Sequence, residues 1–190
     1  MDRLPGADPG WSYSLTGIGV DRAREGSTIK PMLLVVLTIS DRCSQGLLED
    51  TAGPAVVARL RQDWPEAEIR SRLLPDDEEK IVATLEKLSS QGAALVLTVG
   101  GTGLGPRDRT PEATRRVIDR EAPGLAEAMR FHGASQNPFA WLSRGVAGLR
   151  GSMLIVNLPG SLRGAEQSLS SILALLDHGM EIAAGSQTHP

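Results

Sequence analysis

The sequence contains few of the residues that build disulfide frameworks, cysteine metal clusters or membrane spans. Its 190 residues include one cysteine, Cys43, and three histidines. A single cysteine excludes an internal disulfide framework and a cysteine metal cluster, and it fits a reducing compartment, so we expect a cytoplasmic protein. The longest apolar run, Met32 to Ile39, is far shorter than the roughly 20 residues that span a bilayer, so no membrane association is expected.

The chain also lacks an excess of positive charge. It carries 20 Lys and Arg against 23 Asp and Glu, and the two signs are mixed along the sequence. Proteins that bind nucleic acid concentrate Lys and Arg on one face, so we expect no nucleic-acid partner.

Residues 1–30 differ in composition from the rest of the chain. They contain Gly, Pro, Asp, Ser and Arg without helical or strand periodicity, and they lack the apolar stretch of a secretory signal. We expect a flexible N-terminal extension there. The length of the chain suits one good hydrophobic core, which predicts one domain over residues 31–186.

Short apolar runs alternate with helical patterns from residue 31 onward. Continuous apolar runs indicate strands that helices cover on both faces, at residues 32–39, 93–99 and 152–157. Residues 68–74 alternate polar and apolar side chains, as a strand nearer the sheet edge does. Helices are expected between and after these strands, with starts near Pro54, Asp76 and Pro123 and with Thr110 and Ser161 as N-caps of two others. Strands separated by helices predict an α/β fold, a three-layer sandwich with a mostly parallel central sheet.

The segment Gly100–Asp108 follows a predicted buried strand and holds four glycines in six positions. Glycines let the backbone approach an anion closely and direct several N–H groups at one point, so the segment is a candidate phosphate loop. The Walker A pattern and the G-x-G-x-x-G dinucleotide pattern are both absent from it. A flexible turn is the alternative interpretation.

Two further loops follow predicted strands. Residues 40–54 concentrate hydroxyls and carboxylates, which is also ordinary turn chemistry. Residues 157–161 open a helix whose free N–H groups suit an anion. Ligands of α/β sheets bind at the carboxyl ends of the strands, so three such loops together favour a binding site at that edge.

Eight short blocks then occur in order between about Met32 and Ile182. They are Leu37–Asp41, Glu49–Pro54, Leu74–Asp76, Thr98–Gly103, Pro106–Thr114, Leu142–Arg144, Ala147–Gly151 and Asn157–Gly160. Together they resemble the molybdopterin-binding family of molybdenum cofactor biosynthesis, which includes molybdopterin adenylyltransferases, their B-type relatives and the G domains of gephyrin and plant Cnx.

This resemblance implies the molybdopterin-binding fold and an enzyme. Its reaction would transfer the adenylyl group of Mg-ATP to the terminal phosphate of molybdopterin and release pyrophosphate. Mg²⁺ is the implied cofactor, and ATP and molybdopterin are the implied substrates. A homotrimer is expected, with other molybdenum cofactor enzymes as further partners. The substrate's own phosphate is the nucleophile, so the protein mainly positions anions and neutralises charge.

Two carboxylates, Asp76 and Asp108, match the catalytic and metal-binding positions of the family. Mg²⁺ prefers carboxylate oxygens together with phosphate oxygens. Each aspartate also has a structural interpretation: Asp76 with Glu79 forms a helix-capping pattern, and Asp108 is a turn residue beside Pro106.

The remaining matched positions have implied binding roles. A hydroxyl and a guanidinium in the Leu142–Arg144 block suit a phosphate or the pterin. The implied substrate-binding and nucleotide-binding residues are Thr38, Ser40, Asp41, Gly100, Gly101, Thr102, Gly103, Ser143, Arg144, Asn157, Pro159 and Gly160.

The sequence departs from the family pattern in its glycine loop. Arg109 stands where many relatives have Val, and residues 103–107 resemble the plant and B-type loops. The alternative function is therefore a B-type protein that binds molybdopterin and hands it over with little or no catalysis.

Overall fold

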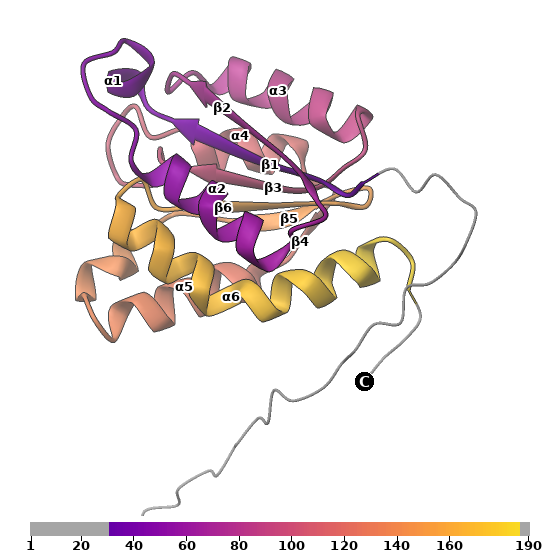
Figure 1. Cartoon of the computed structure of the whole chain (residues 1–190). Coiled ribbons are helices and arrows are strands. Elements are labelled where there is room, and N and C mark those ends of the chain that lie inside the picture. The colour runs from indigo at the N-terminus through magenta and orange to yellow at the C-terminus, as the bar shows by residue number, and fades with distance from the viewer. Residues whose placement is uncertain (1–30, 187–190) are drawn as a thin grey trace, which may run out of the picture. The chain divides into compact units, whose positions relative to one another are not determined.

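A six-stranded sheet forms the centre of the protein, in a computed structural model that describes residues 31–186 (Figure 1). The strand order is β2-β1-β3-β6-β5-β4. Four strands, β1, β2, β3 and β6, run parallel, whereas β5 is antiparallel to both β6 and β4. The strands are β1 Leu33–Ile39, β2 Glu68–Leu74, β3 Ala93–Val99, β4 Arg120–Glu121, β5 Ala147–Arg150 and β6 Met153–Leu158.

Helices cover both faces of this sheet. In Figure 1, α3 and α4 lie on one face, and α2, α5 and α6 lie on the other. The helices are α1 Asp41–Ser44, α2 Ala52–Asp63, α3 Glu78–Ser90, α4 Thr110–Val117, α5 Pro123–Ala134 and α6 Leu162–Ala183, with a 3₁₀ helix, η1, at Pro138–Leu142. The predicted three-layer α/β sandwich is confirmed. The flexible extension expected for residues 1–30 lies outside the described residues.

The layers follow from the alternation of side chains along buried strands. All seven residues of β1 are buried, and successive side chains enter two separate cores. Leu34 and Val36 pack in the core that includes Leu60 of α2 and Ile172 of α6. Leu33, Val35 and Leu37 pack on the other face with residues of α3. A continuous apolar run therefore produced a strand buried on both faces, as expected.

The sequence predicted one edge of the sheet but not the other. β2 lies at one edge, as its alternating pattern predicts. β4 and β5 were not predicted, because strands of two and four residues are too short for a recognisable period.

Two helix starts differ from expectation. Thr110 was expected to cap its helix, but Arg109 occupies the capping position and the Thr110 hydroxyl donates to the Gly100 carbonyl at 2.9 Å. Asp77, not Asp76, caps α3 by accepting from the Lys80 N–H at 3.1 Å. Ser161 caps α6 as predicted, accepting from the Gly164 N–H. In both cases the residue that the sequence suggested as a cap makes contacts at the carboxyl end of the parallel strands instead.

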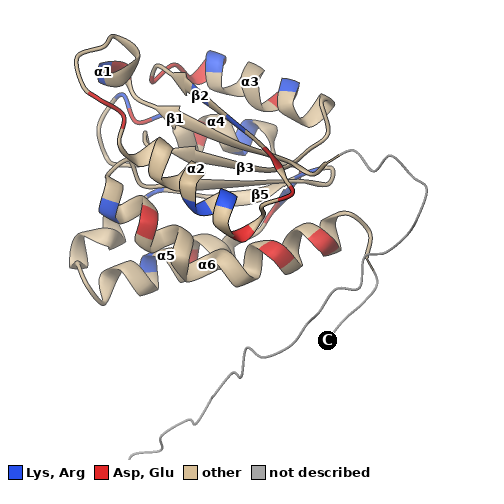
Figure 2. Cartoon of the chain, in the orientation of Figure 1, with Lys and Arg blue, Asp and Glu red and all other residues tan. Residues whose placement is uncertain are grey.

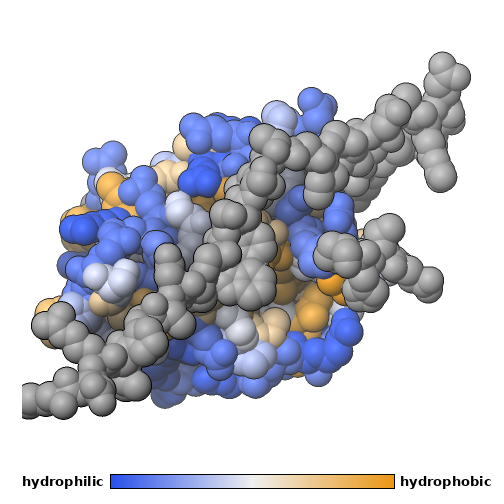
Figure 3. Space-filling model, turned by 90° about the horizontal axis from the view of Figure 1, so that it is seen from below, coloured by the Kyte–Doolittle hydropathy of each residue, from blue (hydrophilic) through white to orange (hydrophobic). Residues whose placement is uncertain are grey.

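The surface combines both charge signs with scattered apolar residues. Figure 2 shows acidic and basic residues interspersed over helices and loops. Figure 3, a view from below, shows hydrophilic residues over much of the visible surface with smaller hydrophobic areas between them. Over residues 31–186, each helix is too short or too polar to cross a membrane.

Candidate functional site

A cleft of about 1000 Å³ lies at the carboxyl ends of the parallel strands. The loops after β1, β2, β3 and β6 meet there, together with η1 and the start of α6. The structure brings into its wall the predicted residues Thr38, Ser40, Asp41, Asp76, Gly100, Gly101, Thr102, Gly103, Asp108, Ser143, Asn157, Pro159 and Gly160. Arg144 is the predicted residue that does not line this cleft.

Asp41 and Asp76 hold the ends of β1 and β2 together by exchanging hydrogen bonds. The Asp41 N–H donates to Asp76 Oδ2 at 2.8 Å, and the Asp76 N–H donates to Asp41 Oδ1 at 3.0 Å. The helix-capping interpretation of Asp76 is therefore wrong, because Asp77 has that role. The Asp76 carboxylate instead faces the cleft with its geometry set by the backbone of a neighbouring loop.

Burial raises the pKa of the Asp76 carboxyl above its ordinary value. Repulsion from Asp41 and Asp108 acts in the same direction, whereas the hydrogen bond from the Asp41 N–H and the charge of Arg107 oppose it. A half-buried carboxylate near two others binds a cation favourably, because a cation removes that repulsion. This electrostatic arrangement is common at functional sites.

The glycine loop contacts the sheet too closely for side chains. Gly100 and Gly101 have φ angles of 108° and 62°, which L side chains rarely adopt. A Cβ on Gly100 would collide with the Ile39 carbonyl oxygen, and a Cβ on Gly160 would lie 3.0 Å from the Gly100 Cα. The Gly100 N–H donates to the Leu158 carbonyl at 3.1 Å. Gly100 therefore contributes close packing, and the predicted anion-binding amides are those of residues 101–103.

Asp108 fits both interpretations of the sequence, because it stabilises a turn and also lines the cleft. Its Oδ2 accepts from the Gly105 N–H at 2.8 Å, so it does stabilise the turn. The residue also lines the cleft, and the absence of a side chain on Gly103 leaves room for it, because a Cβ there would be 3.0 Å from Oδ2.

Arg144 supports the glycine loop from outside the cleft. Its guanidinium pairs with Glu112 and donates to the carbonyls of Gly103 and Asp108, at 2.7 and 2.6 Å. All of these partners belong to the protein, so the geometry indicates that Arg144 positions the loop. Direct substrate binding by Arg144 stays a prediction without support from these contacts.

Asn157 is a buried connector whose polar atoms are all used inside the protein. Its Nδ2 donates to the hydroxyls of Thr98 and Thr114, at 3.0 and 2.9 Å, and its Oδ1 accepts from the Val146 N–H. With 1% of its surface exposed, this side chain ties β6 to β3 and α4. The geometry thus favours a positioning role for Asn157 beside the more accessible Pro159 and Gly160.

The sequence interpretation missed two basic residues in this region. Arg107 pairs with Asp41 across the loops, and Arg130 of α5 lines the cleft and donates to the Gly145 carbonyl at 3.0 Å. Arg107 lies inside a matched block, so its charge next to Asp108 was a usable signal. No local pattern distinguishes Arg130 from other arginines on helices.

The carboxylates suit a metal ion that arrives with a phosphate ligand. Within residues 31–186, no group of three or more His, Cys, Asp or Glu residues is arranged to hold a metal ion by itself. Mg²⁺ commonly binds through about one or two carboxylates plus substrate phosphates. Asp76 and Asp108, both in the cleft wall, match that donor set and would hold the ion.

These features define an α/β protein with a cleft lined by glycines and carboxylates at the carboxyl edge of a parallel sheet. Residues 35–178 match the family described as a probable molybdopterin binding domain. The match covers well over half of the chain, so the chain belongs to the molybdopterin-binding family of molybdenum cofactor biosynthesis.

Several named relatives share this domain. The molybdopterin adenylyltransferase of Haemophilus influenzae is 41% identical over 139 residues, which cover 72% of this chain and 71% of the relative. The Drosophila melanogaster molybdenum cofactor synthesis protein cinnamon is 37% identical over 148 residues, 77% of this chain and 25% of that protein. The chain spans between 24% and 47% of the length of cinnamon and two other large relatives.

Solved structures agree with this assignment. The molybdopterin biosynthesis enzyme MoaB of Thermus thermophilus superposes with a TM-score of 0.75 at 45% identity, covering 82% of this chain and 98% of that one. The molybdopterin biosynthesis Mog protein of Mycobacterium ulcerans superposes with a TM-score of 0.77 at 33% identity, and the match covers 83% of this chain and 99% of that one.

The close contacts of the glycine loop predict a steric penalty. Gly101→Ala should lower the free energy of unfolding more than Gly92→Ala. Both glycines have positive φ, which costs an alanine about 1–2 kcal/mol. Only at Gly101 would the new Cβ also meet Thr110 and Asp76, whereas Gly92 faces open space; such crowding adds about 1–3 kcal/mol. Urea unfolding measures the loss of stability in each variant. Equal losses would show that the loop can accommodate a Cβ at Gly101 without a steric penalty.

The raised pKa of Asp76 predicts the sign of a pH effect. A carboxyl with a raised folded-state pKa contributes stability below its unfolded pKa and loses it as the pH rises through the folded value. Asp76→Asn should therefore gain stability relative to the wild type as the pH rises above about 4, the ordinary pKa of an aspartate.

Asp77→Asn is the matched control for this measurement. The Lys80 N–H lowers the pKa of the Asp77 carboxyl, so Asp77→Asn should lose stability relative to the wild type as the pH rises toward about 4 from below. Urea unfolding at several pH values gives both slopes. Slopes of the same sign would contradict the electrostatic description of the cleft.

Proposed function

We propose that this chain is a molybdopterin adenylyltransferase. It transfers the adenylyl group of ATP to the terminal phosphate of molybdopterin and releases pyrophosphate. The observation that carries the proposal is the meeting of Asp76, Asp108 and the glycine loop in one cleft. The names of relatives such as the Haemophilus influenzae enzyme, which match over most of their length, support the same reaction.

The reaction requires positioning and charge neutralisation more than covalent chemistry. A phosphate oxygen of molybdopterin attacks the α-phosphorus of ATP, and a new P–O bond forms. The bond from that phosphorus to the oxygen bridging the β-phosphate breaks, and the electron pair leaves with pyrophosphate. No residue of the protein needs to form a covalent bond, because both reacting groups belong to the substrates.

The cleft residues divide this work by their chemistry. The amides of residues 101–103 and the N-terminal end of α6 suit phosphate oxygens, because both direct N–H groups at an anion. Asp76 and Asp108 would hold Mg²⁺, which when bound withdraws charge from the phosphates. The hydrogen bonds from Asp41 and Gly105 orient these two carboxylates before any ligand enters. Such prior orientation reduces the reorganisation needed during reaction.

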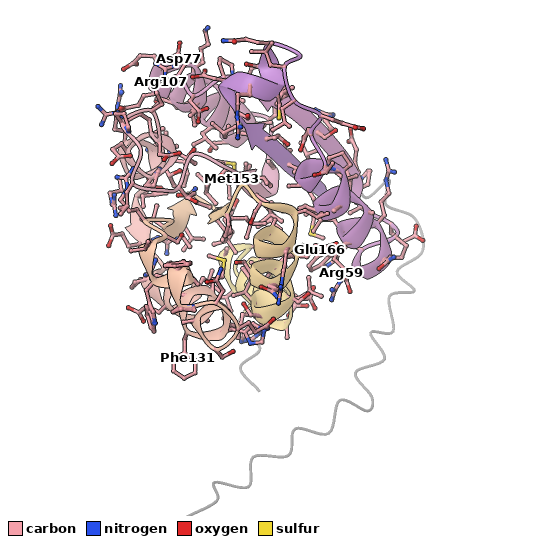
Figure 4. All side chains as sticks on the ribbon, turned by 90° about the vertical axis from the view of Figure 1, so that its left-hand side faces the viewer. Arg59, Asp77, Arg107, Phe131, Met153 and Glu166 are labelled. Atoms are coloured by element: carbon pink, nitrogen blue, oxygen red, sulfur yellow. The ribbon has the colours of Figure 1, made fainter. Side chains whose placement is uncertain are left out.

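We also propose a homotrimer in the cytoplasm, which hands its product to other enzymes of molybdenum cofactor synthesis. Phe131 and Trp141 are 74% and 57% exposed on α5 and η1. Figure 4 shows Phe131 directed away from the body of the protein. Large exposed apolar side chains are typical of contact surfaces, which supports assembly. Sedimentation equilibrium tests it, and a monomer at micromolar concentration would exclude the trimer.

The adenylyl-transfer proposal predicts a separation of turnover from binding. Purified protein with molybdopterin, Mg²⁺ and ATP should produce adenylylated pterin and pyrophosphate. Asp76→Asn and Asp108→Asn should each lower kcat by about 10²–10³, while molybdopterin affinity changes far less, because charge neutralisation matters most in the transition state. Asparagine keeps a carbonyl oxygen for the Asp41 or Gly105 N–H, so the loops retain their hydrogen bonds.

Asp77→Asn provides the matched control, because Asp77 is outside the cleft and asparagine is an equally good cap. It should leave kcat unchanged. A wild-type protein that binds molybdopterin tightly yet forms no product would overturn the enzyme proposal in favour of the B-type carrier.

A further inference from the structure

Arg107 connects the glycine loop to the paired aspartates of the cleft. Its Nε and Nη2 both donate to Asp41 Oδ2, at 3.0 and 2.8 Å. The other oxygen of Asp41 accepts from the Asp76 N–H, so the guanidinium joins the reciprocal Asp41–Asp76 arrangement. Arg107 also lies near Asp77 at the same end of the molecule, as Figure 4 shows.

The charge of Arg107 balances part of a negatively charged region. Asp41, Asp76 and Asp108 all line the cleft, and Asp41 and Asp108 both act on the Asp76 carboxyl by repulsion. Arg107 has the opposite effect on Asp76, and the hydrogen bonds to Asp41 raise the pKa of the Arg107 guanidinium itself. One guanidinium therefore already offsets part of the negative charge that faces the proposed Mg-ATP.

The contact is also easily broken. The Arg107 side chain is 68% exposed, compared with 29% for Asp41. Exposed ion pairs contribute only about 0.2–1 kcal/mol, because water and salt screen them. Arg107 belongs to a surface loop without regular secondary structure. The guanidinium can thus move away from a doubly charged cation at small cost.

We propose that Arg107 is a built-in counter-cation of the cleft, which is held at Asp41 and whose positive charge opposes the binding of a divalent cation by Asp76 and Asp108. The proposal rests on the adenylyl-transfer function, since it assigns how the cleft responds to the metal ion of its nucleotide. Arg107 is a positioning residue in this role, because it acts through Asp41 and needs no contact with the reacting atoms.

Metal binding without nucleotide tests this role directly. Mn²⁺ added to the full chain can be followed by the paramagnetic resonance signal of the free ion, without any turnover. Removing the competing charge in Arg107→Gln should tighten Mn²⁺ binding by about 1.4-fold to fivefold, the effect expected from one weak, partly screened ion pair. Arg107→Lys should lie between the two, because lysine keeps the charge but not the planar two-donor contact.

Arg116→Gln is the matched control, because Arg116 is also an exposed arginine in ion pairs, with Glu78 and Glu79, but outside the cleft. It should leave Mn²⁺ affinity unchanged. In an Asp41→Asn background, Arg107→Gln should lose its effect, because the guanidinium is no longer held at Asp41. Thermal unfolding of each variant confirms that the chain is folded.

The outcomes separate this inference from the proposed function. Unchanged or weaker Mn²⁺ binding in Arg107→Gln, with normal product formation by the wild type, overturns the counter-cation role and leaves the enzyme in place. Tighter Mn²⁺ binding in that variant supports the role, even if the wild type forms no adenylylated pterin.

Discussion

The reciprocal hydrogen bonds between Asp41 and Asp76 are the constraint on which the rest of the cleft depends. They join the loops after β1 and β2, and they orient the half-buried Asp76 carboxylate toward the glycine loop. Gly101 has room for no side chain, because the Thr110 hydroxyl and then this carboxylate lie close to it. Thr110 also holds the same loop through the Gly100 carbonyl. The paired aspartates thus form one wall against which the glycine loop packs.

The same arrangement stores electrostatic repulsion at the site. Asp76 loses hydration and faces two further carboxylates, which raises its pKa and opposes the stability of the folded state near neutral pH. Arg107 relieves part of that repulsion from the exposed side. A cleft with this balance binds an added cation more readily than three solvated carboxylates would. The surroundings of Asp76 therefore lower the stability of the folded state while they favour the binding of a cation.

Much of the fold was predictable because its signals are local. The buried run of β1, the edge position of β2 and the cap at Ser161 were each predicted from neighbouring residues, and the structure confirms all three. Thr110 was assigned wrongly as a cap, and the capping alternative for Asp76 is wrong, because the same side chain can cap a helix or bond to a distant loop. Arg144 was expected at the substrate, but its partners Glu112 and Gly103 meet it only in the folded chain.

The sequence alone determined the α/β class, the family and the loops that form the cleft. The hydrophobic period and the glycine spacing are visible in neighbouring residues, and the eight ordered blocks together indicate the family. Tertiary structure decided the work of each side chain. In the folded chain Asn157 bonds to other buried side chains, Arg144 supports the glycine loop from outside the cleft, and Arg107 bonds to Asp41. Asp41 and Arg107 are 66 residues apart, and only the parallel order of the strands brings such distant groups to one edge.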